Sequence, residues 1–220
     1  MKIFIDTANI EEIKRANNMG VVAGVTTNPS ILKKAGRNPV DVLSEIRAFI
    51  GSEAELHAQV ISKDAQGMIK EAYKMREVLG ENTFIKIPVI PEGLKAIKAL
   101  AKEGVNITGT AIYNQMQGFL AGKAGAKYVA PYVNRIGNLG ADPMELISNL
   151  QDRIEDDGYD CKIVAASFKG VEQVKNAFNY GAEAITAPYA VLKQVFANPN
   201  IDKAVTDFNN DWYAVYGEGK

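Results

Sequence analysis

Short apolar runs of about five residues alternate with longer stretches of helical periodicity along the whole chain. KIFID at 2–6 and FIKIP at 84–88 are typical of β-strands. The stretch 39–50 instead repeats apolar residues at positions 42, 43, 46 and 50, which is the spacing of one helix face. The pattern predicts strands at 2–6, 22–27, 56–60, 84–88, 106–110, 127–133, 162–167 and 182–187, and helices at 9–19, 39–50, 65–79, 91–102, 113–125, 142–157, 171–181, 189–196 and 201–216.

Eight strand–helix pairs followed by one further helix predict an α/β fold, a closed parallel (β/α)8 TIM barrel with an extra C-terminal helix. Helix-start signals support the count, since Asp142 suits an N-cap and Pro143 the first helical turn. The chain contains no linker or low-complexity segment, so residues 1–220 are expected to form a single domain. An open doubly wound sheet is the alternative fold.

Charge and composition narrow the possible functions. The chain has 220 residues, 47% of them hydrophobic, and a net charge of −1, which favours neither nucleic acid nor a membrane surface as partner. The first residues lack the apolar segment of a secretory signal, so a cytoplasmic protein is expected. With one cysteine, Cys161, and one histidine, His57, zinc sites built from such residues are excluded by count, and no metal or cofactor is expected.

Polar residues gather where the predicted strands end. In a (β/α)8 barrel these carboxyl ends meet at one face, where the active site lies. The residues expected there, which together would form a ring around a ligand, are Asp6, Thr26, Asn28, Gln59, Lys86, Thr110, Tyr132, Arg135, Ser167 and Lys169.

Lys86 is the unusual member of this ring, because it lies inside an apolar strand. Side chains alternate along a strand, so Ile85 and Ile87 share one face while Phe84 and Lys86 share the other. If the isoleucines face the helices, Lys86 points into the barrel, where burial lowers the pKa of the amine and makes it a nucleophile toward carbonyls. The alternative is a lysine paired with Asp6 or with a nearby glutamate.

The neighbours favour chemistry over a structural ion pair. If Lys86 forms a Schiff base with a ketone, cleavage of a C–C bond needs a group that takes the proton of a β-hydroxyl. Tyr132, Asp6 or a water held by Gln59 and Thr110 would serve. Phosphate-binding groups are also present, since Arg135, Ser167 and Lys169 offer positive charge and hydrogen-bond donors. The combination predicts a ketose phosphate as substrate.

Five segments carry a resemblance to a known family: DTAN at 6–9, GVTTNPS at 24–30, KIPV at 86–89, APYVNRI at 130–136 and AASFK at 165–169. They resemble the transaldolase-like class I aldolases, in order and from Asp6 to about Trp212. Within that family the pattern is most similar to the fructose-6-phosphate aldolases. The resemblance implies a Schiff-base lyase that joins dihydroxyacetone or a similar hydroxyketone to glyceraldehyde 3-phosphate and splits fructose 6-phosphate in reverse.

The resemblance also implies roles for residues. Lys86 matches the Schiff-base lysine. Two further positions, Gln59 and Tyr132, match the aldolases, because the transaldolases of this family typically carry glutamate and phenylalanine there. Transaldolase activity, which moves the same three-carbon unit between sugar phosphates, is the alternative. The remaining matches are polar positions around the lysine, Asp6, Asn28 and Thr110, and phosphate-binding positions, Arg135 and Ser167.

Two features remain open. His57 lies two residues before Gln59 on the same strand face, where relatives usually carry an aromatic or apolar residue. It either fills core space with one hydrogen bond or tunes Gln59 or a bound water. The C-terminal helix, 200–216, carries Trp212. In this family such a helix packs against a neighbouring subunit, which implies a homo-oligomer, a pentamer or decamer.

Overall fold

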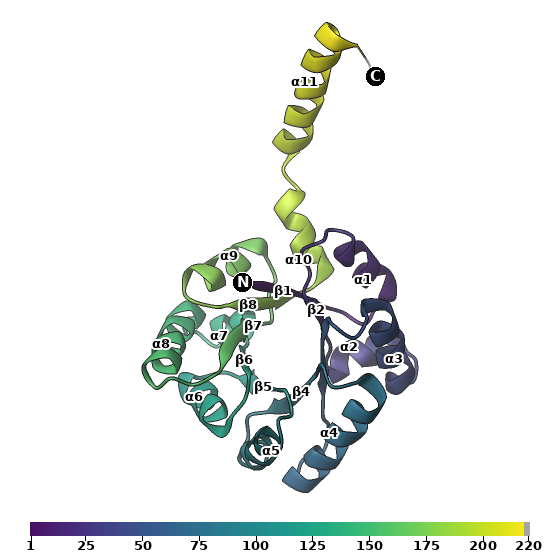
Figure 1. The fold of residues 1–220 in the computed structure, drawn as a ribbon. Helices are drawn as coiled ribbons and strands as arrows, with labels where there is room; N and C mark the ends of the chain where they lie inside the picture. The colour runs from purple at the N-terminus through teal and green to yellow at the C-terminus, as the bar shows by residue number, and fades with distance from the viewer. Residues whose placement is uncertain (218–220) are drawn as a thin grey trace.

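The computed structural model describes residues 1–217 and shows a closed barrel of eight parallel strands, each hydrogen-bonded to its neighbours in chain order (Figure 1). The predicted (β/α)8 fold is therefore confirmed. The barrel closes where β1 pairs with β8, with Ile3 opposite Ile185. The strands are β1 (Lys2–Asp6), β2 (Gly24–Thr26), β3 (Glu55–Gln59), β4 (Thr83–Pro88), β5 (Ile107–Ile112), β6 (Tyr128–Pro131), β7 (Lys162–Ala165) and β8 (Ala184–Ala187).

Helices surround the barrel, and sequence signals explain several of their ends. Asp142 caps its helix as predicted, because its side chain accepts hydrogen bonds from the backbone N–H groups of Met144 and Glu145. The helices are α1 (Ile10–Asn17), α2 (Pro29–Ala35), α3 (Pro39–Ile50), α4 (Ala65–Leu79), α5 (Pro91–Lys102), α6 (Gln115–Ala124), α7 (Val133–Asn138), α8 (Pro143–Asp156), α9 (Val171–Asn179), α10 (Tyr189–Lys193), the 3-10 turn η1 (Gln194–Phe196) and α11 (Pro199–Tyr216).

Two short helices differ from the sequence-based prediction. Helix α2 follows β2 directly, with Asn28 as N-cap and Gly36 in the left-handed region at its end. Helix α7 replaces the end of the strand predicted at 127–133, because β6 stops at Pro131 and Tyr132 begins the helical hydrogen bonding by accepting from Ile136 N–H at 2.8 Å. Both helices lie at the carboxyl end of the barrel and shape its mouth.

The strands separate two apolar regions. Their outward side chains, among them Ile85, pack against the helices in the larger core. Inward side chains such as Phe4 and Phe84 form a smaller cluster within the barrel. Lys86 shares the inward face of Phe84, so the predicted orientation of this strand is confirmed.

Helix α11 extends away from the barrel (Figure 1), and none of its residues is buried. Phe208 is 71% exposed and Trp212 is 59% exposed, with the Trp212 ring 4.4 Å from that of Tyr216. Large aromatic side chains left open to water on one helix are typical of a surface that meets a partner.

Candidate active site

A cavity of about 1000 Å³ opens at the carboxyl ends of the strands. Of the ten side chains predicted for the site, Thr26 and Thr110 lie buried behind the cavity wall and contact residues that line it. The other eight line the cavity: Asp6, Asn28, Gln59, Lys86, Tyr132, Arg135, Ser167 and Lys169.

Lys86 reaches the cavity from β4 and is 6% exposed. Its Nζ donates a hydrogen bond to the backbone oxygen of Thr27 at 2.8 Å. Within residues 1–217 no carboxylate oxygen lies within ion-pairing distance of this amine. Burial lowers the pKa of Lys86, and the negative charge of Asp6 only partly offsets this effect.

Asp6 ends β1, and its carboxylate accepts a hydrogen bond from Thr26 Oγ1 at 2.7 Å. The Thr26 hydroxyl also meets Thr186 Oγ1 at 2.6 Å, so Asp6 is held from the side of β2 and β8. Burial raises the pKa of Asp6, against the opposing effects of Lys86, the Thr26 hydrogen bond and Arg135. Burial thus shifts the acid and the amine in opposite directions, and both shifts favour the uncharged forms.

Tyr132 lies at the start of α7, with its hydroxyl 2.9 Å from Thr110 Oγ1. The guanidinium carbon of Arg135 lies 4.7 Å from the centre of the Tyr132 ring. Arg135 Nη1 also donates to the hydroxyl of Tyr113 at 3.2 Å, and this bond contributes most to raising the pKa of Arg135. The arginine is therefore a fixed positive charge beside the phenol that points into the cavity.

Ser167 and Lys169 follow β7, across the cavity mouth from α2. Ser167 has φ of 65°, a left-handed conformation that costs about 1 kcal/mol or more for a residue with a side chain. Ala111, on β5, also lines the cavity with φ of 58°. Both strained residues lie at the cavity wall, where such conformations commonly serve function.

Asn28 and Gln59 line the cavity where β2 and β3 end. The Asn28 side-chain oxygen accepts from Ile31 N–H at 3.0 Å, so it caps α2 and leaves its amide nitrogen free to donate to a ligand. Gln59 is the Cα partner of Lys86 across β3 and β4, and its side chain makes no hydrogen bond to other groups in residues 1–217. The Gln59 amide is therefore available to a ligand or a water beside the lysine.

Sequence reasoning missed several side chains that line the cavity, and two of them hold predicted site residues in place. Thr186 lines the cavity from β8 and bonds to Thr26. The signal was present, since Thr186 is the one polar residue of the strand AITA. Tyr113, which holds Arg135, follows β5 and was predicted instead as the first residue of a helix. Only its hydrogen bond with Arg135, which follows the neighbouring strand β6, shows its role.

Three further structural findings concern residues 1–217. This part of the chain has no group of three or more His, Cys, Asp or Glu side chains arranged to hold a metal ion. None of its helices has the length and apolar character needed to cross a membrane. The thiol of Cys161 is buried beneath α6, and burial raises its pKa to about 12, so it is a poor nucleophile.

The geometry defines a (β/α)8-barrel protein with a buried, unpaired lysine in a polar cavity at the carboxyl ends of its strands. The sequence matches the family described as "Transaldolase/Fructose-6-phosphate aldolase" over residues 3–218. It is also 48% identical over 216 residues to a "Probable fructose-6-phosphate aldolase" of Streptococcus pneumoniae (strain ATCC 700669 / Spain 23F-1), an alignment that covers 98% of this chain and 97% of the relative. The chain therefore belongs to the transaldolase/fructose-6-phosphate aldolase family of enzymes, and the predicted family is confirmed.

Proposed function

We propose that the protein is a Schiff-base aldolase that cleaves fructose 6-phosphate into dihydroxyacetone and glyceraldehyde 3-phosphate and catalyses the reverse addition. The observation that carries the proposal is the Lys86 amine, buried at the cavity without a carboxylate partner and with a lowered pKa. The name of the Streptococcus pneumoniae relative, a probable fructose-6-phosphate aldolase, agrees with this substrate.

In the proposed reaction, the neutral Lys86 amine attacks the ketone carbon of open-chain fructose 6-phosphate. Loss of one water leaves an iminium, which takes the electron pair of the C3–C4 bond when that bond breaks. A base must remove the C4 hydroxyl proton as the aldehyde leaves. The resulting enamine is protonated at C3, and hydrolysis releases dihydroxyacetone and the free lysine.

Tyr132 is the proposed proton carrier for the C4 hydroxyl. Its phenol points into the cavity and is oriented by Thr110 at 2.9 Å. Asp6, whose pKa is raised by burial, and a water on Gln59 complete the path by which protons reach Lys86 during the dehydration step. Arg135, Ser167 and Lys169 are the proposed phosphate site, because they bring charge and donors to one side of the cavity.

The product assay distinguishes this function from the transaldolase alternative. We expect free dihydroxyacetone to accumulate from fructose 6-phosphate without any acceptor. Activity that appears only when erythrose 4-phosphate is added would instead establish a transaldolase. Borohydride added during turnover should leave a stable adduct on Lys86 for either activity, and absence of an adduct would overturn both.

We further propose that the active form is a homo-oligomer, a pentamer or decamer, assembled through α11. The exposed aromatic side chains Phe208 and Trp212 support this assembly. Removing 199–220 should shift the protein to smaller species in sedimentation velocity. If the truncated protein still sediments with the same number of chains per particle, the role of this helix in assembly is contradicted. The cytoplasmic location expected from the sequence stays a prediction.

A further inference from the structure

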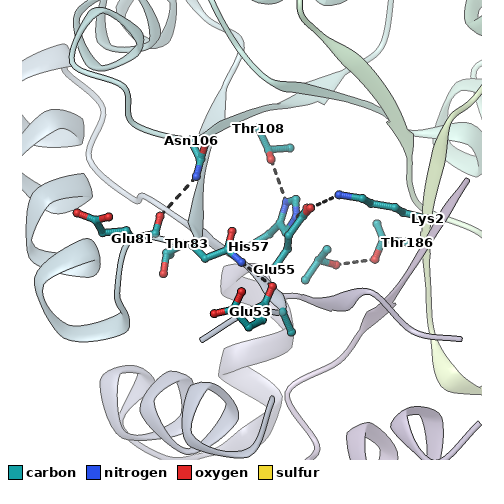
Figure 2. Close-up of polar contacts among 12 residues, drawn as sticks. Lys2, Glu53, Glu55, His57, Glu81, Thr83, Asn106, Thr108 and Thr186 are labelled. Atoms are coloured by element: carbon teal, nitrogen blue, oxygen red, sulfur yellow. Dashed lines mark hydrogen bonds and ion pairs between the residues drawn. The ribbon is translucent and has the colours of Figure 1, made fainter. Parts of the chain in front are cut away.

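A polar chain crosses the barrel interior below the cavity (Figure 2). Lys2 on β1 pairs with Glu55 on β3, and the other carboxylate oxygen of Glu55 lies 3.4 Å from His57 Nε2. On the opposite side of the ring, His57 Nδ1 lies 2.9 Å from Thr108 Oγ1 on β5. The chain therefore links three alternate strands through the lumen, in a region otherwise filled by apolar side chains.

The hydrogen bonds fix which nitrogen of His57 carries the proton. Burial alone would raise the pKa of Glu55, but the bonds from His57 and Lys2 outweigh it and lower that pKa, so the carboxylate is ionised and only accepts. His57 Nε2 must then donate to it.

The imidazole itself stays neutral. Burial lowers the pKa of His57 to about 4, the positive charges of Lys86 and Lys2 act in the same direction, and Glu55 opposes them. Tyr128 is the other titratable group that faces the ring, at 5.6 Å between ring centres. A neutral ring with its proton on Nε2 has a free lone pair on Nδ1, which accepts the Thr108 hydroxyl.

His57 also packs against the residues that support the cavity floor. Its ring stacks on Phe84 at 4.7 Å with an angle of 12°, and meets Phe4 edge-on at 4.9 Å. Its own exposed fraction is zero. A movement of this ring would therefore displace side chains of β1, β4 and β5, since a close-packed interior has no free volume to absorb it.

Each of these contacts lies directly below a residue of the proposed active site. Strand side chains repeat every two residues on one face, so position i+2 lies one layer above position i. By this spacing Phe84 supports Lys86, and Thr108 supports Thr110, the partner of the Tyr132 hydroxyl. The remaining two pairs are Phe4 below Asp6 and His57 below Gln59.

From this arrangement we infer that His57 is a positioning residue for the proposed aldolase reaction: through Thr108 and Phe84 it sets the height and direction of Thr110 and Lys86 without touching substrate. The inference rests on the proposed function of Lys86. It assigns His57 a role beyond filling space, because its two hydrogen bonds specify one ring orientation that an apolar residue in the same volume would not specify.

The first test replaces the hydrogen bonds and keeps the stacking. His57→Phe preserves an aromatic ring against Phe84 and loses both polar contacts. We expect kcat for fructose 6-phosphate cleavage to fall about 10- to 100-fold with KM within about threefold, since small displacements of reacting groups cost rate rather than binding. Thr108→Val should show the same split with a smaller loss of about three- to tenfold.

Thr83→Val is the matched control. Thr83 is also a fully buried strand threonine, but its hydroxyl donates outward to Leu79 of α4. It should leave kcat within about twofold of the wild type at a comparable loss of thermal stability. If Thr83→Val lowers kcat as much as Thr108→Val does, the effect is general destabilisation and the assignment of His57 is overturned.

The second test needs no substitution, because His57 is the only histidine of the chain. In protein labelled with 15N-histidine, we expect one neutral imidazole signal with the proton on Nε2 from pH 8 to pH 5.5. We also expect this signal to shift when a ketose is trapped on Lys86 with borohydride. A protonated ring, a proton on Nδ1 or an unmoved signal in the trapped protein would overturn the inference, even if His57→Phe does not fold.

The outcomes separate this inference from the proposed function. If no adduct is trapped on Lys86 in the wild type, the proposed aldolase function is overturned. If the wild type is trapped normally and a folded His57→Phe variant keeps kcat within twofold, only the inferred role of His57 is overturned.

Discussion

Each end of the barrel interior contains a lysine and a carboxylate, but only at the amino-terminal end do the two form an ion pair. At the amino-terminal end, Lys2 and Glu55 form an ion pair that His57 extends. At the carboxyl end, Lys86 is buried and Asp6 is partly buried, yet within residues 1–217 the lysine amine is hydrogen-bonded to a backbone carbonyl and to no carboxylate. The paired end keeps its charges, while the unpaired end is pushed toward neutral forms.

This difference shows how one barrel combines stability with reactivity. A buried charge that has a partner stays ionised and costs the fold less than a buried charge without one. A buried amine without a partner costs stability and gains nucleophilicity, because its uncharged form is the reactive one. Four changes, from the largest expected effect to the smallest, test this contrast.

Replacing the unpaired amine should give the largest effect. Lys86→Met is expected to lower fructose 6-phosphate cleavage by at least about 10³-fold, because the other lysines that line the cavity, Lys34 and Lys169, are exposed to water. The free energy of unfolding should stay the same or rise, since a buried amine with a lowered pKa is itself unfavourable. Steady-state kinetics and urea unfolding measure the two effects. A marked loss of stability in this variant would show that Lys86 is structural.

Removing the proposed proton carrier comes next. Tyr132→Phe keeps the ring beneath Arg135 and removes the hydroxyl that meets Thr110. We expect kcat to fall about 10²-fold or more with little change in KM, the usual range for loss of a general acid–base group. Schiff-base trapping should persist in this variant. Equal losses in trapping and cleavage would place Tyr132 at an earlier step than proton transfer from the C4 hydroxyl.

The neutral histidine of the paired end should make stability depend on pH. In the unfolded chain His57 takes up a proton near its ordinary pKa of 6.5, whereas the folded protein binds it only near pH 4. The unfolded state therefore binds more protons between these values, and stability falls as pH decreases. Between pH 7.5 and pH 5 the loss should be about 2 kcal/mol.

The control for this pH effect is His57→Phe, measured by urea unfolding over the same pH range. The variant has no imidazole, so the difference between the two pH profiles isolates the contribution of His57. Parallel profiles would mean that the ring is not kept neutral by burial.

The smallest effect is expected from replacing Lys2, the more exposed member of the ion pair at the amino-terminal end of the barrel. The Lys2 side chain is 46% exposed but that of Glu55 only 11%, so replacing Lys2 leaves His57 as the remaining side-chain partner of the Glu55 carboxylate. Because Lys2 is half-exposed and His57 still contacts Glu55, Lys2→Met should cost about 1 kcal/mol, the upper end of the range for exposed ion pairs. A loss above about 2 kcal/mol in thermal or urea unfolding would show that Glu55 depends on Lys2 for its charge.

The sequence was sufficient for the alternation of strands and helices and for the inward direction of Lys86, because both follow from short-range periodicity. It was also sufficient for the ring of polar residues at the strand ends, eight of which line the cavity. These features depend on local chemistry and on one geometric rule of parallel barrels.

The missed features all depend on contacts between distant segments. Tyr113 lies beside Arg135 because the two residues follow β5 and β6, which are neighbours in the barrel although their segments are 22 residues apart in the sequence. Helix α7 was not predicted: the predicted strand at 127–133 ran two residues past the end of β6 and included only Val133, the first residue of this helix. The sequence also left open whether Lys86 pairs with Asp6 or with a nearby glutamate. In the part of the chain that the structure describes, neither carboxylate is within ion-pairing distance, and the Lys86 amine instead donates to the backbone oxygen of Thr27.

The central claim is that the Lys86 amine loses its proton more readily than an ordinary lysine and then reacts with a ketone. The most direct measurement is the rate of reductive trapping of dihydroxyacetone on Lys86 as a function of pH, read by mass spectrometry of the peptide that contains it, with Lys86→Met as the blank. We predict a rate that reaches half its plateau well below pH 10.5, the ordinary pKa of the amine. A midpoint at or above that value, or an adduct on any other lysine, would contradict the account.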